Sequence, residues 1–379
     1  MYFFIIFILA FFSFFEFYFN KKYAFKILLV FLTGILFFIL LGFNSFSPDL
    51  DLYRLHYEDI DQEYIKLIVE PLIFYLMTFS KYMGLSFEGY LLCFSFIVFS
   101  IFIYSLFKYS PLPVFVCLNF FFIPFFPDIA QIRFFLGFSV FLYAIQFFHS
   151  KKWLFYSLLI IAILCHLSLI TIFIFLLLRK FKFFKSQKLS NIIIVSAICL
   201  LLFVPKSILE PVLFFLNPKY LTYIDNDGLA TGTFLGTLVL FMPFFIVNNI
   251  VIWHYNNKYS EENVPIRYAK YVPLFVELVQ FSSFMILLQY FIRDFSRINQ
   301  NILIISTIYF SIIIYSLIEE NKRQTAGIVA VLVLASTIIN YYIQFLMVNN
   351  FVYFELINKT FTSNYLFDFV VNFFDFSDR

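Results

Sequence analysis

Residues 153–178 read WLFYSLLIIAILCHLSLITIFIFLLL, an apolar run interrupted by a few hydroxyl side chains and one histidine. A helix needs about 20 apolar residues to span a bilayer, so this run is long enough to lie in a membrane. Both flanks are basic: Lys151 and Lys152 precede it, and Arg179 and Lys180 follow it. Short basic loops stay in the cytoplasm. Both ends of the run are therefore expected on the same side of the membrane.

A single straight helix does not meet that condition. Residues 153–178 as one helix would be about 39 Å long and would carry one flank across the membrane. Two short helices that turn back near His166 resolve the conflict, so we predict a helical hairpin here. His166 then lies at or below the outer surface, where a polar turn is tolerated only if it lines a wet cavity.

The composition of the whole chain extends the membrane interpretation. Of 379 residues, 63% are apolar and 13% are charged, against roughly 45–50% and about 25% in soluble domains. The net charge of +3 comes without a basic patch, so no nucleic-acid partner is expected. The four cysteines lie in apolar runs without a CxxC pair and are interpreted as core residues. We predict no metal site and no cofactor.

We predict an all-α, polytopic bundle that forms one transmembrane domain over 1–379. Residues 1–19 are interpreted as a membrane helix, because no basic segment precedes them and no signal-peptidase site follows. The hairpin brings the total to about 12 crossings, with two larger outer loops at 44–89 and 205–232. Short re-entrant or interfacial helices are expected in these loops, residues 65–86 among them. The apolar segments fall near 1–19, 26–43, 90–107, 111–127, 133–149, 153–178, 190–204, 233–253, 271–291, 299–318 and 326–348.

The first outer loop offers a carboxylate beside two phenols. Asp49, Tyr53 and Tyr57 recur every four residues, so a helix would place them on one face. Such a group could deprotonate or orient a sugar hydroxyl. The alternative is a solvated, interfacial start to an outer loop.

Arginines near the outer ends of two segments are candidate anion ligands. Arg133 is followed directly by apolar residues, and a guanidinium there makes bidentate contacts with phosphate oxygens. The alternatives are an arginine that reaches lipid headgroups or pairs with Asp128. Arg293 and Arg297 lie four apart and could bind a second phosphate, unless Asp294 simply neutralises them. His166 has the titration range of a base or of a phosphate-binding cation, although a lone histidine is usually a core residue.

These motifs resemble the EpsG-like family of Wzy-type O-antigen and capsular polysaccharide polymerases. The family's first outer loop carries Asp-Tyr-x-x-Tyr-x-x-x-Tyr, which Asp49, Tyr53 and Tyr57 match, with Leu at position 50. The acidic residue before the next segment is matched by Glu70. Further resemblances are the run Ile132 to Leu136, the pair His166 and Ser168, the tyrosines Tyr220 and Tyr223, and a late arginine, Arg293 or Arg297.

The resemblance implies glycosyl transfer at the outer face of the bacterial inner membrane. The donor would be a glycan on undecaprenyl diphosphate, and the acceptor a lipid-linked repeat unit. Membrane lipids and other envelope polysaccharide-assembly proteins are the further partners expected. The predicted catalytic residues are Asp49 or His166 as the base and Arg133; the diphosphate ligands are Arg133, Arg293 and Arg297; the sugar contacts are Tyr53, Tyr57, Glu70, Gln131, Tyr220 and Tyr223.

Three other functions remain open from the sequence. A lipid-linked oligosaccharide flippase or other transporter would carry charges along a cavity at mid-membrane depth, whereas these charges cluster at one face. An O-antigen ligase-type glycosyltransferase would share the donor and differ in the acceptor. A structural membrane protein would leave Arg133 and His166 unexplained.

Overall fold

A computed structural model describes residues 2–19, 22–47, 49–122, 125–179, 187–201, 231–258, 264–291 and 296–347. The secondary-structure elements in these ranges are all α- or 3-10 helices, in agreement with the predicted class. The chain divides into two compact units, the first ending at Ile170 and the second beginning at Thr171. The predicted single bundle over 1–379 stays a prediction.

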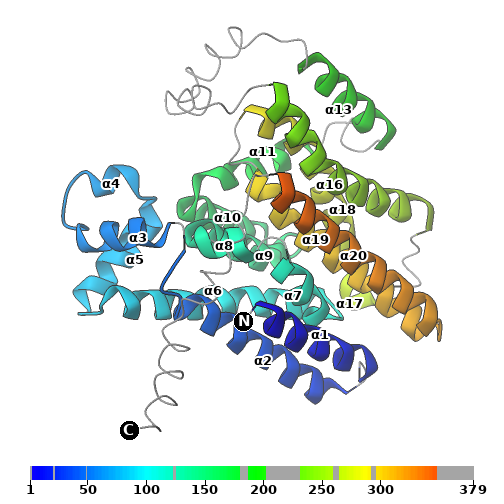
Figure 1. The fold of residues 1–379 in the computed structure, drawn as a ribbon, viewed down its shortest axis with the longest axis horizontal. Helices are drawn as coiled ribbons and strands as arrows, with labels where there is room; N and C mark the ends of the chain where they lie inside the picture. The colour runs from blue at the N-terminus through cyan, green and yellow to red at the C-terminus, as the bar shows by residue number, and fades with distance from the viewer. Residues whose placement is uncertain are drawn as a thin grey trace. The chain divides into compact units, whose positions relative to one another are not determined.

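The first unit combines longer apolar helices with short helices between them (Figure 1). The longer ones are α1 (Tyr2–Tyr18), α2 (Tyr23–Gly42), α6 (Phe87–Tyr109), α7 (Pro113–Phe122), α9 (Ile132–Ala144) and α10 (Lys152–Cys165). The short ones are α3 (Leu50–Glu58), α4 (Ile65–Ile68), α5 (Pro71–Tyr82), α8 (Phe125–Ala130), η1 (Ile145–Phe147) and η2 (Leu167–Leu169).

The second unit contains the helices from α11 onward. Helix α11 begins at Ile170, the residue before the boundary. The helices of this unit are α11 (Ile170–Leu178), α13 (Gln187–Leu201), α16 (Thr231–Lys258), α17 (Ile266–Ala269), α18 (Val272–Phe291), α19 (Ser296–Glu319) and α20 (Arg323–Met347). Helices α16, α18, α19 and α20 pack on one another. Polar side chains join them: the Asn248 amide donates to the Ser282 hydroxyl at 2.5 Å, and His254 Nδ1 lies 2.8 Å from the Tyr309 hydroxyl. Such contacts hold helices together where apolar burial offers little.

Within the described residues, three helices are long and apolar enough to cross a membrane: Tyr23–Gly42, Phe87–Tyr109 and Ile298–Glu319. Several shorter apolar helices accompany them. The chain is therefore a membrane protein of several apolar helices, and the total of about 12 crossings stays a prediction.

Two predicted segments can be compared in detail with the helices observed. The apolar stretch 111–127 is split, because α7 ends at Phe122 and α8 begins at Phe125. The stretch 65–86 contains the 12-residue α5, about 18 Å long and shorter than the hydrocarbon core. That length suits the interfacial or re-entrant helix expected there.

The predicted break inside 153–178 lies at the expected residue. Helix α10 ends at Cys165, and His166 is extended, with φ −158° and ψ 117°. The short η2 follows, and α11 begins at Ile170, the last residue before the unit boundary. The break is thus observed, whereas the return of the chain as a hairpin stays a prediction.

Aromatic side chains form much of the core of the first unit. The Phe120 ring stacks on Phe135 at 5.5 Å and packs against Phe102 at 4.6 Å between centroids. Other phenylalanines are exposed along α1, among them Phe3 and Phe14. An exposed aromatic face suits lipid rather than water, so the high phenylalanine content serves both the core and the lipid-facing surface.

One end of the first unit is rich in lysine. The Lys26 ammonium donates to the Pro111 carbonyl at 2.6 Å, which joins the start of α2 to the α6–α7 connection. The Tyr109 hydroxyl donates to the Leu142 carbonyl at 2.8 Å, which brings the end of α9 to the same place. Lysines at this end of the helices are Lys22, Lys26, Lys108, Lys151 and Lys152.

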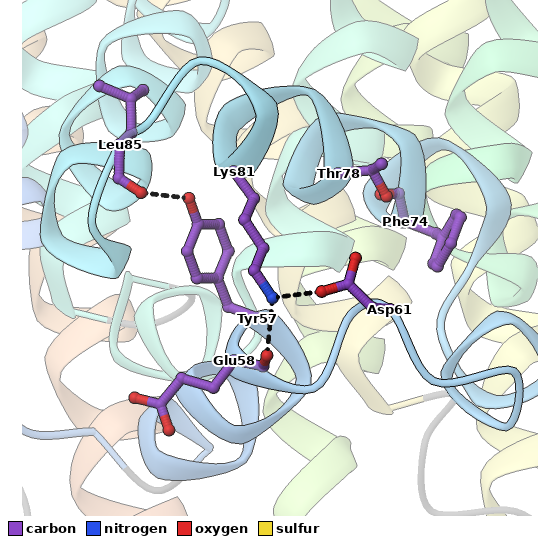
Figure 2. A network of polar contacts seen from close by, with 7 residues as sticks. All are labelled: Tyr57, Glu58, Asp61, Phe74, Thr78, Lys81 and Leu85. Carbon is purple, nitrogen blue, oxygen red and sulfur yellow. Dashed lines mark hydrogen bonds and ion pairs between the residues drawn. The ribbon is translucent and has the colours of Figure 1, made fainter.

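The opposite end is built by α3, α4 and α5 beside the start of α6 (Figure 1). Figure 2 shows how Lys81, at the end of α5, holds α3: its ammonium donates to the Glu58 carbonyl at 2.8 Å and to Asp61 Oδ2 at 2.7 Å. A cation at a helix C-terminus satisfies the last carbonyls and the dipole. The Tyr57 hydroxyl donates to the Leu85 carbonyl at 2.7 Å. These contacts fix the orientation of α3, and therefore of its buried face.

Candidate functional site

Three charged or titratable residues from separate helix ends meet at this second end. Arg133 is the second residue of α9, and His166 directly follows α10. Glu70 precedes α5, which begins with Pro71, a residue suited to the first helical position because it lacks an N–H. Helices α9 and α10 are joined by a short connection and pack together, so the start of one lies beside the end of the other.

Arg133 is held by two partners. Its Nη1 donates to Glu70 Oε2, and its Nε donates to the Tyr53 hydroxyl at 3.4 Å. The guanidinium carbon also lies 5.1 Å from the centre of the Tyr53 ring. The Arg133 and Glu70 side chains are only 18% and 19% exposed. A charge pair this far from water is strongly coupled, and loss of either partner leaves an uncompensated charge.

His166 completes the cluster. Its Nε2 lies 3.8 Å from Glu70 Oε1, and its Nδ1 lies 2.8 Å from the Ser168 hydroxyl. The imidazole meets Phe134 edge-on at 5.4 Å. Glu70 thus faces Arg133 with one oxygen and His166 with the other. We refer to Arg133, Glu70, His166 and Tyr53 as the charged cluster.

The two tyrosines of the Asp-x-x-x-Tyr-x-x-x-Tyr pattern lie on the buried face of α3. Burial raises the pKa of Tyr53, against the opposing effect of Arg133, so this phenol stays neutral at physiological pH and forms hydrogen bonds. Burial also raises the pKa of Tyr57. The Tyr57 hydroxyl is engaged with Leu85, and its ring stacks on Tyr90 at 5.3 Å.

The remaining predicted residues of the first unit flank the cluster. Asp49 occupies the N-cap position of α3 and is half-buried; its carbonyl accepts from the Tyr53 N–H at 3.0 Å. Gln131 precedes α9, and its side-chain oxygen is enclosed without a hydrogen-bond partner in the described part of the chain. The carboxylate that pairs with Arg133 is Glu70, rather than the Asp128 considered from the sequence.

Four predicted ligands cannot be placed beside the cluster. Tyr220, Tyr223 and Arg293 lie outside the described residues, and so does the side chain of Arg297 in α19. Their roles in binding sugar and diphosphate stay predictions.

Two residues that the sequence analysis did not assign border the cluster. His56 is 6% exposed and Tyr90 is 2% exposed. His56 follows Tyr53 by three residues, so the helical spacing could have placed it on the same face. Tyr90 carries no such signal, because it lies in the first turns of an apolar helix. Only the packing of α6 against α3 brings it here.

The second unit contains a separate polar feature. Glu277 is a carboxylate in the apolar helix α18, and its Oε2 lies 3.0 Å from Nε of Arg179. Arg179 is therefore its ion-pair partner. The pair borders a cavity of about 160 Å³, also lined by Tyr255, Asn256 and Gln280. Across the described ranges, no three His, Cys, Asp or Glu side chains gather as metal ligands would.

The fold and the charged cluster define a polytopic helical membrane protein with polar chemistry concentrated at one end of its first unit. The chain belongs to the EpsG family, whose sequence profile matches residues 26–361. The family is one of Wzy-type polymerases, so membership indicates a polysaccharide polymerase-like, glycosyltransferase-like membrane protein. No curated protein and no solved structure matches the chain.

Proposed function

We propose that the chain is a polysaccharide polymerase that transfers a glycan from undecaprenyl diphosphate onto a lipid-linked repeat unit. The observation that carries this proposal is the charged cluster, in which a partly buried arginine, a carboxylate and a histidine meet beside a phenol. Family membership supplies the class of reaction.

The proposed orientation places the cluster at the outer face of the bacterial inner membrane. Its support is the separation of charge within the first unit. Five lysines (Lys22, Lys26, Lys108, Lys151 and Lys152) lie at the end marked by the contact of Lys26 with Pro111, whereas the cluster lies beside the start of α6, at the same end as Lys81. Helix α6 has 23 residues, about 34 Å of helix, which separates the two ends by a bilayer thickness. The positive-inside rule then directs the lysines to the cytoplasm.

The proposed role of Arg133 is to stabilise the diphosphate leaving group. As the bond between the anomeric carbon and the phosphate oxygen breaks, negative charge grows on the diphosphate, and a fixed guanidinium lowers the energy of that state. Nε and Nη1 of Arg133 are oriented by Tyr53 and Glu70. This leaves Nη2, for which no partner is found among the described residues, to meet a phosphate oxygen. Arg293 and Arg297 are proposed as further ligands.

Of the two candidate bases, His166 has the better-supported geometry. An imidazole between a carboxylate and a hydroxyl is oriented as a general base requires. Asp49, by contrast, is linked to the cluster by its electrostatic effect on Tyr53. With Nε2 directed at Glu70, Nδ1 is the basic nitrogen, and it contacts the Ser168 hydroxyl at 2.8 Å. We therefore propose that the Ser168 hydroxyl passes its proton to Nδ1 as it takes up the proton of the acceptor hydroxyl, and that Glu70 stabilises the resulting imidazolium. Tyr53 and Tyr57 are proposed to line the sugar site.

The test is complementation of a deletion strain of the source bacterium. Arg133→Ala, expressed at the wild-type level, should abolish the polymer ladder, whereas Arg54→Gln should not. Arg54 is a matched control because it forms a half-exposed ion pair with Glu88 at 2.6 Å, where α3 meets the start of α6 at the same end of the first unit. Full-length polymer from Arg133→Ala would refute the assignment of Arg133.

The glycan of the deletion strain separates the alternatives. Single repeat units without a ladder indicate a missing polymerase. Loss of all glycan capping would instead indicate an O-antigen ligase-type glycosyltransferase or a flippase.

A further inference from the structure

Besides Oε1 of Gln131, two further enclosed polar atoms border the charged cluster without hydrogen-bond partners. They are Nδ1 of His56 and the hydroxyl of Tyr90, neither of which has a partner within the described residues. Buried polar groups are almost always hydrogen-bonded, because an unmet group loses its hydration without compensation. Two such atoms beside one ion pair therefore need an explanation.

Their location connects both to the charged cluster. His56 lies on the face of α3 that buries Tyr53 and Tyr57, and Tyr53 contacts Arg133. The Tyr90 ring stacks on Tyr57, and its hydroxyl lies within electrostatic range of Tyr53 and Arg133. Both atoms thus border the same region, from α3 on one side and from α6 on the other.

The charge state of His56 limits what it can bind. Burial lowers its pKa, the positive charge of Arg133 lowers it further, and Asp59 opposes both. A neutral imidazole has one donor and one acceptor nitrogen, and a phenol both donates and accepts. Hydroxyl groups match this pair, since each can donate and accept, whereas a diphosphate offers acceptors only.

We propose that His56 and Tyr90 form a subsite for the hydroxyl groups of a sugar, adjacent to the charged cluster. This inference rests on the proposed function and adds two substrate contacts to it. Within the subsite, Nδ1 of His56 and the Tyr90 hydroxyl orient the sugar that Arg133 and His166 act upon. Neither group forms or breaks a covalent bond in this role.

A residue that contacts substrate can be distinguished from one that supports the fold by the effect of its substitution on the stability of the protein. Tyr90→Phe and His56→Leu remove polar atoms that have no partner among the residues that the structure describes. The melting temperature of the purified, full-length protein in detergent should therefore stay equal or rise. The polymer yield in the complemented deletion strain should fall roughly tenfold, as expected for one lost hydrogen bond to substrate.

Two further variants serve as controls for the effects of Tyr90→Phe and His56→Leu on yield and stability. His56→Asn keeps a polar atom near the position of Nδ1 and should recover part of the yield lost in His56→Leu. Tyr104→Phe, on an exposed part of the same helix as Tyr90, should change neither quantity.

The inference is overturned if Tyr90→Phe and His56→Leu make wild-type polymer, as they would if each atom met only a trapped water. It is also overturned if stability and yield fall together, because that result indicates a structural role. Arg133→Ala is measured in parallel. Polymer from Arg133→Ala would count against the proposed function, whereas loss there with normal polymer in the other two variants would reject the subsite alone.

Discussion

Gly137 in α9 lies so close to Ala162 in α10 that a β-carbon on Gly137 would come within 2.8 Å of the Ala162 carbonyl oxygen. The obstacle is backbone, which does not move aside as a side chain does. Arg133 lies one helical turn before Gly137, and His166 lies one turn after Ala162. The small residues therefore set the separation of the two helices at the level that brings Arg133 and His166 to Glu70.

Gly137→Ala is expected to destabilise the protein by about 1–3 kcal/mol, the usual cost of overpacking a close contact. The added methyl would also approach Leu169 Cδ1 at 2.5 Å and Cys165 Cβ at 3.2 Å. Because α9 must move away from α10, polymer yield should fall as well. Thermal unfolding in detergent and the glycan ladder measure the two effects. The matched control is Gly327→Ala in α20, where a β-carbon meets nothing within 4 Å; equal melting temperatures for both variants would contradict the prediction.

Glu16 is expected to stabilise the start of α7 from a different helix. Its two carboxylate oxygens accept from the Val114 and Phe115 N–H groups at 3.1 and 3.0 Å, in the buried interior. Glu16→Leu leaves both donors unmet, at a cost of about 1–3 kcal/mol each. Glu16→Gln keeps one acceptor oxygen and should fall between Glu16→Leu and wild type in thermal unfolding. A leucine variant as stable as the glutamine variant would show that these hydrogen bonds contribute nothing.

The lowered pKa of His56 predicts how the stability of the folded protein depends on pH. Its pKa in the folded protein is lowered by burial and by Arg133, whereas the unfolded chain keeps the ordinary value near 6.5. Below about pH 6.5 the unfolded chain binds a proton that the folded chain resists, so stability falls as pH falls through this range. Melting temperatures measured between pH 7.5 and 5.5 should decline less in His56→Asn than in wild type. Parallel declines would exclude His56 as the source.

Tyr53 contacts Arg133 through both its hydroxyl and its ring. Tyr53→Phe removes the hydrogen bond and keeps the ring, so polymer yield should fall moderately, by roughly tenfold or less. Tyr53→Leu removes both contacts and should fall further. The amount of each variant in the membrane is measured alongside yield, so that expression is separated from activity. Equal yields from the two variants would show that the ring does not help to hold Arg133.

Some of the site was predictable because its signals are local. The spacing of Tyr53 and Tyr57 predicted that they share one face of a helix; both lie on one face of α3, which is buried. The flanking lysines and arginines indicated a helix break near His166, which is also observed. Glu70 was expected near the sugar, but its role as the partner of both Arg133 and His166 was not derivable. The exact partner depends on how α5 packs against α10.

By itself, the sequence determined that this chain lies in a membrane, where its helix breaks, and which family it belongs to. Hydropathy, charge at segment ends and short motifs are properties of neighbouring residues, so they can be read without a fold. Only the tertiary structure decided that Arg133 pairs with Glu70, 63 residues away, that Glu16 caps a helix 98 residues further on, and that His56 and Tyr90 border the same cluster. In an apolar interior a buried polar group must find a partner wherever packing places one, and packing is settled by the whole unit.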